Sequence, residues 1–372
     1  MVEPRVERTE ARIGVRVGGE VVFSDTTDHF ENGFVRLLGI TRPQAEAFLV
    51  AAAPGLVGKG TGDDHLKVLA EAWERVAGLP GGRLEVLPTT RGIRCGSHPL
   101  AAEQVWAPAI GRDTEHCMVG STEPAHAWLV DRSTMSPVVL EEGYYEEDYF
   151  EGAREGVGYG DYIEQAGWRL EKAARQVRQV GGLLDFLGVD RGDRALRLLD
   201  VGAGYGFFRM AAAEAGIEHE GTEVSRHAAT VARDLFGFDT RLESLAEVAA
   251  ATPGRFDAIV MWDFLEHVVD PVAIVADAHD ALVPGGALFV RTPNLLADEH
   301  RVFGTSYHSL KLEHLHMFSP DSLALCLSEG GLVPRVVLSE SHLLRGFLQL
   351  DVDRAATTLR GSDLLAVAQR RA

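Results

Sequence analysis

Three glycines at alternate positions follow a short apolar run that contains an aspartate near its end. The run is Leu198 to Val201, with Asp200 inside it, and the glycines are Gly202, Gly204 and Gly206. A buried parallel strand has such an apolar run, and glycines after it let the backbone turn tightly and approach a ligand. The apolar residues that follow suit a helix whose first amides face the same ligand. The spacing therefore predicts a strand, a loop and a helix that hold a ligand against bare backbone.

Two carboxylates narrow the choice of ligand. Asp200 would repel an anion such as a pyrophosphate, for which the expected spacing is G-x-G-x-x-G, whereas a cationic amino-acid group would be attracted. Glu223 comes one strand–helix–strand unit later, at the end of a second short strand. A carboxylate in that position can accept hydrogen bonds from both hydroxyls of a ribose. A dinucleotide remains the alternative ligand.

These residues resemble class I S-adenosylmethionine (SAM) methyltransferases, and further segments match that family in the same order. Residues 255–267 resemble its fourth strand with a substrate-facing D-x-x-E-H end, and residues 282–290 its P-G-G turn into the fifth strand. Residues 313–319 and 144–150 resemble segments of one subgroup that acts on sugars and other natural products. The resemblance covers about residues 141–372. It implies SAM as the methyl donor and S-adenosyl-L-homocysteine as the product.

The resemblance also implies which residues bind the cofactor. They come from the glycine loop, from the ends of the next strands and from the segment before the first strand. The residues are Asp200, Gly202, Ala203, Gly204, Gly206, Phe207, Glu223, Val224, Leu242, Glu243, Trp262, Asp263 and Tyr149. The neighbouring aromatic residues from Tyr144 to Tyr162 are expected either to cover the cofactor or to pack against the core.

Histidines near the expected methyl position are the candidate bases. Methyl transfer is an in-line displacement, so the enzyme must mainly align its reactants, and a hydroxyl nucleophile must also lose its proton. Histidine titrates near neutrality and suits that task. We expect His267 and His314 as bases, with Glu313 polarising His314 or binding substrate, and Asp263 orienting the sulfonium or the substrate. The alternative is that His267 only caps its loop.

Two groups of residues offer metal ligands, but neither has a standard zinc spacing. One is the set Cys95, His98, His116 and Cys117, and the other is the group of histidines between residues 300 and 316. We therefore assign no metal.

Composition limits the partners and the compartment. The chain has 372 residues and a net charge of −19, with no block rich in Lys or Arg. Phosphate binding needs clustered basic residues, so we expect a small-molecule substrate and no nucleic acid. No apolar run is long enough to cross a membrane and the first residues are too polar for a signal peptide, so we expect a cytoplasmic protein without membrane partners. The oligomeric state is left open, with a homodimer as one option.

Strands and helices alternate along the second part of the chain. Trp168 to Leu187 is the first expected helix, and strands are expected at 196–201, 219–223, 239–242, 256–262, 286–292, 332–338 and 363–369. Such alternation predicts an α/β fold with a parallel sheet covered on both faces. The resemblance implies a Rossmann-like, seven-stranded, mostly parallel sheet whose last strand is antiparallel. Because ligands bind beyond the carboxyl ends of the strands, Asn294 is expected at the same rim as Asp200.

Residues 1–140 are expected to form a smaller N-terminal α/β domain for substrate recognition or dimerisation, followed by the methyltransferase domain at 141–372. Its expected elements are a hairpin over 13–23, helices over 43–53 and 65–79, and strands at 84–87 and 127–130.

The function expected from all these features is O-methylation of a small polar metabolite, such as a sugar or an intermediate of natural-product or antibiotic biosynthesis. One alternative is N- or C-methylation of a carrier- or scaffold-bound substrate presented by the N-terminal domain. Another is a non-catalytic SAM-binding partner subunit.

Overall fold

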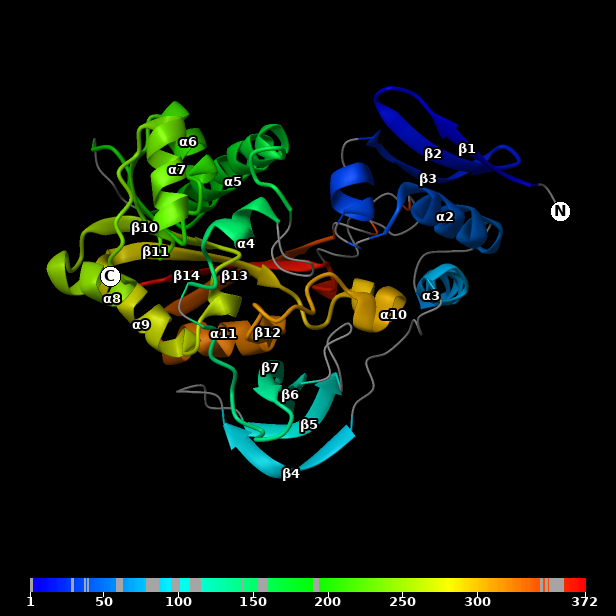
Figure 1. Cartoon of the computed structure of the whole chain (residues 1–372). Helices are drawn as coiled ribbons and strands as arrows, with labels where there is room; N and C mark the ends of the chain where they lie inside the picture. Colours follow the sequence, from blue (N-terminus) through cyan, green and yellow to red (C-terminus); the bar gives the residue numbers. More distant parts are fainter. Residues whose placement is uncertain are drawn as a thin grey trace.

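The described residues form three β-sheets with helices around them (Figure 1). The computed structural model describes residues 3–27, 30–36, 38, 40–57, 63–77, 87–94, 101–107, 115–141, 143–152, 160–189, 194–341, 344, 347 and 358–372, with 87–94 and 101–107 described by their backbone.

The largest sheet has six strands in the order β13-β14-β11-β10-β8-β9. The strands are β8 (Arg197–Val201), β9 (Glu218–Thr222), β10 (Phe256–Trp262), β11 (Leu282–Pro293), β13 (Val333–Glu340) and β14 (Asp363–Gln369). β9, β8, β10 and β11 run parallel, whereas β14 lies antiparallel between β11 and β13. The antiparallel last strand is therefore confirmed. Asp200 pairs with Val260 on one side and Gly221 on the other, so the carboxyl ends of these strands form one edge.

Helices cover both faces of this sheet because its strands are buried on both sides. In Figure 1, α5 (Ala166–Phe186), α6 (Phe207–Glu214) and α7 (Arg226–Phe236) lie on one face, and α8 (Leu245–Ala251), α9 (Pro271–Ala281) and α11 (Pro320–Glu329) lie on the other. Side chains from α5 and α6 share one apolar cluster with β8, β10 and β11, and side chains from α8, α9 and α11 share a second. The expected α/β architecture with two covered faces is confirmed.

One expected strand is wrong. Residues 239–242 form a single bridge, from Arg241 to Thr222, so the sheet of the described residues has six strands rather than seven. Arg241 donates its amide to the Gly221 carbonyl and its carbonyl accepts from the Glu223 amide. The chain then turns at once into α8, because Ser244 and Glu247 form a capping box at the start of that helix. The helix begins too early for the pairing to continue.

The first part of the chain holds a three-stranded sheet of β1 (Pro4–Arg8), β2 (Arg12–Val17) and β3 (Glu20–Thr26). Next come η1 (Phe30–Val35), α2 (Arg42–Leu56) and α3 (Asp63–Ala77), so the expected hairpin and both helices are confirmed. Their apolar core includes Phe303 of α10 (Asp298–Phe303) and Phe347, which come from the second part of the chain. Residues from both sides of position 140 therefore share one core.

A five-stranded sheet follows in the order β12-β7-β6-β5-β4. Its strands are β4 (Leu87–Arg94), β5 (Ala101–Ala107), β6 (His116–Thr122), β7 (Ala125–Asp131) and β12 (His316–Phe318). The expected strand at 127–130 is confirmed within β7, whereas residues 84–86 lie outside the described residues. β12 belongs to the second part of the chain and pairs antiparallel with β7. The division at residue 140 thus remains a proposal, with a shared sheet across it.

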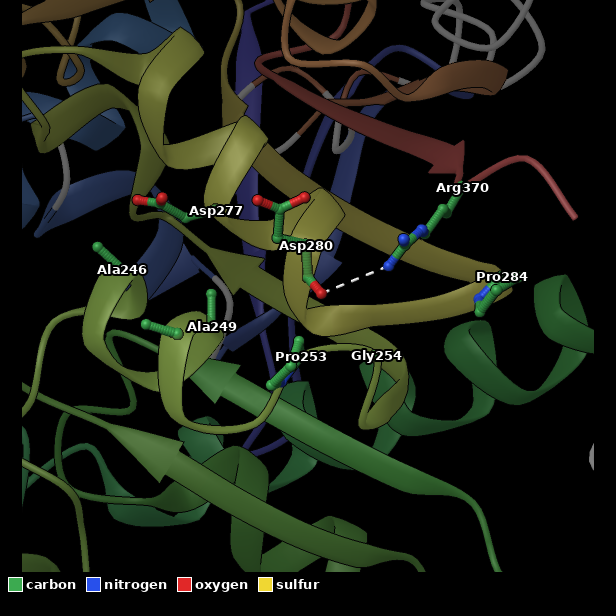
Figure 2. Close-up of a pocket in the computed structure, with 9 residues that line it drawn as sticks. Ala246, Ala249, Pro253, Gly254, Asp277, Asp280, Pro284 and Arg370 are labelled. Carbon is green, nitrogen blue, oxygen red and sulfur yellow. Dashed lines mark hydrogen bonds between the residues drawn. The ribbon is translucent and has the colours of Figure 1, made fainter.

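A pocket lies at the opposite edge of the six-stranded sheet, where β10 and β11 begin (Figure 2). Its charged residues are Asp277, Asp280 and Arg370, and it contains none of the residues expected in the site.

No helix of the described residues has the length and apolar character needed to cross a membrane.

Candidate functional site

The glycine loop joins β8 to α6 and leaves backbone exposed toward the carboxyl edge of the sheet. Gly202, Gly204 and Gly206 have φ angles of 74°, 51° and 85°, which favour glycine. The amides of Gly202 and Ala203 both donate to the Thr222 carbonyl, at 3.0 and 2.9 Å, and so fix the loop to β9. A Cβ at Gly202 would come within 2.5 Å of the Phe264 ring. Only glycine fits at this position.

Glu223 follows β9 and faces the same loop. Its carboxylate accepts from the Gly204 amide at 2.8 Å and from the Ser225 amide at 2.9 Å. A carboxylate has about four lone-pair positions, so it can accept further hydrogen bonds from hydroxyl donors. Burial raises the pKa of Glu223, and the backbone amides oppose that rise. The expected ribose-binding carboxylate is thus buried and oriented by backbone donors.

Asp200 lies at the end of β8 beneath the loop and is 2% exposed. Burial raises its pKa to about 7, with Glu223 adding to the rise and Arg209 opposing it. A cation nearby would stabilise the ionised form. The side chain therefore fits a cationic group, such as the ammonium or sulfonium of SAM, better than an anion.

The other expected cofactor residues divide into exposed and packed ones. Val224 and Leu242 are 66% and 41% exposed, and Glu243 is exposed beside Leu242. These three side chains can therefore face the adenine base of a nucleoside. Phe207, Trp262 and Tyr149 pack against other aromatic rings. Bare glycine backbone, a carboxylate with free lone pairs and exposed apolar side chains together fit the parts of SAM.

Asp263, at the end of β10, is held by two cations. It has a φ of 55°, which is uncommon outside glycine. Its carboxylate accepts from Lys172 Nζ at 3.0 Å and from Arg291 at 2.8 Å. Burial lowers the pKa of Lys172 to about 8, with Arg291 adding to the effect and Asp263 opposing it. Lys172 and Arg291 were not predicted in the site, because they are distant in the sequence from Asp263.

His267 lies in η2 (Leu265–His267), directly beyond β10. Its Nδ1 is 2.8 Å from the Glu313 carbonyl and 3.1 Å from the Tyr145 hydroxyl. Because a carbonyl only accepts, Nδ1 carries the proton and Nε2 keeps its lone pair. Burial lowers the pKa of His267 to about 4, so the ring is neutral near pH 7.

The structure brings His314 next to His267, with ring centroids 4.9 Å apart. His314 Nδ1 is 2.6 Å from the Ser309 carbonyl, so its Nε2 also keeps a lone pair. Burial, His267 and Lys311 lower the pKa of His314. Glu313 meets His267 through its backbone carbonyl, while its carboxylate accepts from the Tyr144 hydroxyl at 3.3 Å.

Glu266 belongs to the D-x-x-E-H segment but was not among the predicted site residues. It is fully buried, and neither carboxylate oxygen has a hydrogen-bond partner among the described residues. Burial and the Asp263 charge raise its pKa. The Thr292 hydroxyl lies close enough to lower that pKa, but not in hydrogen-bonding geometry.

An aromatic strap over residues 143–152 crosses the site. Tyr144 and Tyr145 contact Glu313 and His267, and Phe150 stacks on Tyr205 of the glycine loop at 4.9 Å. Glu146 accepts from the Ser225 hydroxyl at 3.2 Å and from the His227 amide at 3.1 Å, at the start of α7. The strap thus joins the glycine-loop side of the site to the histidine side.

Several other residues that were expected near the site or as metal ligands make contacts within the fold instead. Asn294 follows β11 at the carboxyl edge of the sheet, as expected, but its side chain is buried and donates to the Leu359 and Gly361 carbonyls. The rings of His300 and Tyr307 meet edge to face with centroids 4.0 Å apart, and a nitrogen of His316 lies 3.3 Å from one of His126. Cys95 and His98 lie outside the described residues, and Cys117 is buried in an apolar cluster.

Part of the chain is similar in sequence to known methyltransferases. The sequence model of a family described as "Methyltransferase domain" matches residues 170–335. A ubiquinone biosynthesis O-methyltransferase of Xanthomonas campestris pv. campestris (strain B100) is 35% identical over 116 residues, which is 30% of this chain and 48% of the relative. One of Aromatoleum aromaticum is 30% identical over 189 residues, 47% of this chain and 80% of the relative. A SAM-dependent methyltransferase structure from Archaeoglobus fulgidus is 16% identical with a TM-score of 0.42, covering 56% of this chain and 99% of that one.

The chain spans about half the length, 48%, of the curated relatives that match first. The matched part contains the glycine loop, Glu223, Asp263 and the D-x-x-E-H segment. The chain therefore belongs to the class I S-adenosylmethionine-dependent methyltransferases.

Proposed function

We propose that the protein transfers the methyl group of SAM to a hydroxyl oxygen of a small molecule. Family membership supports SAM as the donor, and the relatives' name, O-methyltransferase, supports oxygen as the acceptor. The observation that carries the proposal is the meeting of His267 and His314 beside the glycine loop. Phe264, three residues before His267, packs on Gly202 and so connects the histidines to the loop.

Methyl transfer to a hydroxyl oxygen requires that the reactants be aligned and that the hydroxyl lose its proton. SAM, when bound, supplies a methyl group on a positively charged sulfur. Asp200 and Glu223 would hold its cationic end and its ribose, and Asp263, anchored by Lys172 and Arg291, would fix the edge of β10. His267 and His314 each keep Nε2 unprotonated, so either imidazole can accept the hydroxyl proton. The acceptor oxygen then bonds to the methyl carbon as the carbon–sulfur bond breaks.

The substrate class is a small polar metabolite, with a sugar or a natural-product intermediate as the first candidate. Glu266 and His314 are almost fully buried, and Tyr144 and Tyr145 contact the neighbouring Glu313 and His267, which suits a small acceptor. The name of the relatives adds an intermediate of ubiquinone biosynthesis as a second candidate. We also propose that residues 1–140 help to recognise the substrate, because β7 pairs with β12, two residues beyond His314. N- or C-methylation of a carrier-bound substrate is the alternative.

A direct assay tests this proposal. The full chain is incubated with SAM and with panels of sugars, phenols and amines, and S-adenosyl-L-homocysteine and the methylated product are measured by mass spectrometry. We expect turnover with hydroxylated acceptors, lost in His267→Asn and His314→Asn while SAM still binds. Turnover that both variants keep, or methylation of amines alone, would contradict the assignment.

A further inference from the structure

We propose that Tyr145 is a positioning residue, which orients the imidazole of His267 and couples that orientation to cofactor binding through the aromatic strap. The inference rests on the proposed function, in which His267 accepts the proton of the acceptor hydroxyl. The Tyr145 hydroxyl lies 3.1 Å from His267 Nδ1, and the two rings meet at 88° with centroids 5.7 Å apart. The residues are 122 positions apart in the sequence, so only the fold brings them together.

The neighbouring carbonyl decides which atom of this contact donates. His267 Nδ1 also lies 2.8 Å from the Glu313 carbonyl, which can only accept, so Nδ1 carries the proton. The Tyr145 oxygen therefore accepts from the same N–H, and the imidazole is held by two oxygens. Burial raises the pKa of Tyr145, with the Glu313 charge adding to the rise, so the hydroxyl stays neutral near pH 7. A histidine held at Nδ1 keeps a fixed tautomer and a fixed direction for its Nε2 lone pair.

Aromatic packing holds the Tyr145 ring in place. Edge-to-face contacts join it to Tyr144 and Tyr149 within the strap, with centroids 5.2 and 5.0 Å apart. Tyr149 in turn contacts Phe150 edge to face, and Phe150 stacks on Tyr205 of the glycine loop. Such ring pairs favour specific geometries. The position of the Tyr145 hydroxyl thus depends on a row of rings that ends on the glycine loop.

Polar contacts form a second path from the strap to the cofactor side. Glu223, the expected ribose carboxylate, accepts from the Ser225 amide at 2.9 Å. The Ser225 hydroxyl donates to the Glu146 carboxylate at 3.2 Å, and Glu146 directly precedes Tyr145. A ribose bound to Glu223 would therefore fix the turn on which Glu146 rests, and with it the neighbouring tyrosine.

Both paths lead from the cofactor side of the site to the proton acceptor. Two sites that bias one structural element are coupled, and the coupling is the same in both directions. Here the shared element is the strap, which contacts the glycine loop through Phe150 and His267 through Tyr145. We therefore expect the cofactor to bind first, because the imidazole takes its reactive orientation once the strap is in place.

The test uses the His267 ring itself as the readout. The full chain is prepared with isotope-labelled histidines, and the His267 signal in nuclear magnetic resonance spectra is assigned by its absence in His267→Asn. S-adenosyl-L-homocysteine is then titrated in, with its affinity measured by calorimetry. We expect it to shift and sharpen the His267 signal of the wild type. In Tyr145→Phe the ligand should still bind, because the ring packing is kept, but the response of His267 should be lost.

Two further variants place this result on the strap. Glu146→Ala should bind S-adenosyl-L-homocysteine more weakly and, at saturation, show the same lost response of His267. Tyr144→Phe is the matched control for Tyr145→Phe, because the Tyr144 hydroxyl meets the Glu313 carboxylate at 3.3 Å rather than His267. It should keep the response. With any acceptor that the wild type methylates, Tyr145→Phe should lower kcat about tenfold at unchanged KM for SAM, as expected for one lost hydrogen bond.

The outcomes separate this inference from the proposed function. A full His267 response in Tyr145→Phe, an equal loss in Tyr144→Phe, or a wild-type signal that ignores the bound ligand would each overturn the role of Tyr145, while the methyltransferase proposal would stand. Circular dichroism checks that Tyr145→Phe is folded. If it is not, Glu146→Ala decides, and a full response there would overturn the coupling. If S-adenosyl-L-homocysteine does not bind the wild type at all, the proposed function fails, and this inference fails with it.

Discussion

The Glu223 carboxylate accepts a hydrogen bond from the Gly204 amide at 2.8 Å, which ties the end of β9 to the glycine loop after β8. The ribose-binding candidate and the loop thus hold each other in place, and no ligand is needed for that contact. A site held in this way has less conformational freedom to lose on binding.

We expect Gly202→Ala to abolish SAM binding. A Cβ there would come within 2.5 Å of the Phe264 ring, and the φ of 74° is itself unfavourable for alanine. The ring and the loop would both have to shift. Calorimetric SAM titration measures the effect.

Gly216→Ala is the matched control for that variant. Gly216 has a φ of 72° but open space around its Cα, so alanine there meets only backbone strain of about 1–2 kcal/mol. Unchanged SAM affinity in both variants would show that the loop does not hold the cofactor.

Asp200→Asn should change how stability depends on pH. The folded-state pKa of Asp200 is raised from 3.8 to about 7, so the folded chain keeps a proton there that the unfolded chain loses near pH 4. Wild-type stability contributed by this group therefore falls as pH rises from about 4 to 7, by up to about 1.4 kcal/mol per pH unit. The melting temperature of Asp200→Asn relative to wild type should rise between pH 5 and 8. A difference that stays flat over that range contradicts the assignment.

The same substitution should lower SAM affinity at pH 8, where wild-type Asp200 is ionised and attracts a cationic ligand. Affinity of the wild type should rise between pH 6 and 7.5, and that rise should be absent in Asp200→Asn. Parallel pH profiles for the two proteins would argue against a cationic group beside Asp200.

Glu146→Ala should loosen the aromatic strap. Glu146 accepts from the Ser225 hydroxyl and from the amides of Arg226 and His227, at the beginning of α7. Loss of carboxylate contacts at a helix start costs about 1 kcal/mol, and the strap would lose its attachment near Glu223. We expect a lower melting temperature and SAM binding weakened severalfold. Glu147→Ala, an exposed neighbour, should leave both unchanged, and equal effects of the two variants would remove the special role of Glu146.

Phe303→Ala should destabilise the whole chain, because the ring of Phe303 is fully buried against Phe34, Phe48 and Trp73 of the first part of the chain. Removing such a ring typically costs about 3–5 kcal/mol. Urea unfolding measures the loss. Phe186→Ala serves as the control, since Phe186 is 76% exposed and its loss should cost about 0.5 kcal/mol or less. A small effect of Phe303→Ala would mean that the two parts fold independently.

The alternating strands and helices could be predicted from the sequence because each has its own local signal. The apolar run of β8, the glycines after it and the serine caps of α7 and α8 lie within a few residues of one another. The prediction of a strand at residues 239–242 is wrong, because this short segment makes a single bridge before Ser244 caps α8. Local patterns also could not reveal that β12 completes the sheet of β4 to β7, since that pairing joins distant parts of the chain.

The candidate site was predicted only where the family pattern or a local motif marked it. Glu223 and the glycine loop lie near each other as expected, and His267 and His314 do meet. Lys172, Arg291 and Glu146 were not predicted in the site. Their partners are distant in the sequence, and no local pattern shows which partner a charged residue will have. The isolation of Glu266 depends on what surrounds it in three dimensions, and only the structure provides that information.

Calorimetric titration of SAM and of S-adenosyl-L-homocysteine into the full chain, beside Glu223→Ala, tests cofactor binding most directly. We expect about micromolar binding of SAM to the wild type and at least tenfold weaker binding to the variant, a loss of about 1.4 kcal/mol or more. Absence of SAM binding to the wild type would contradict the claim that the glycine loop and Glu223 hold this cofactor.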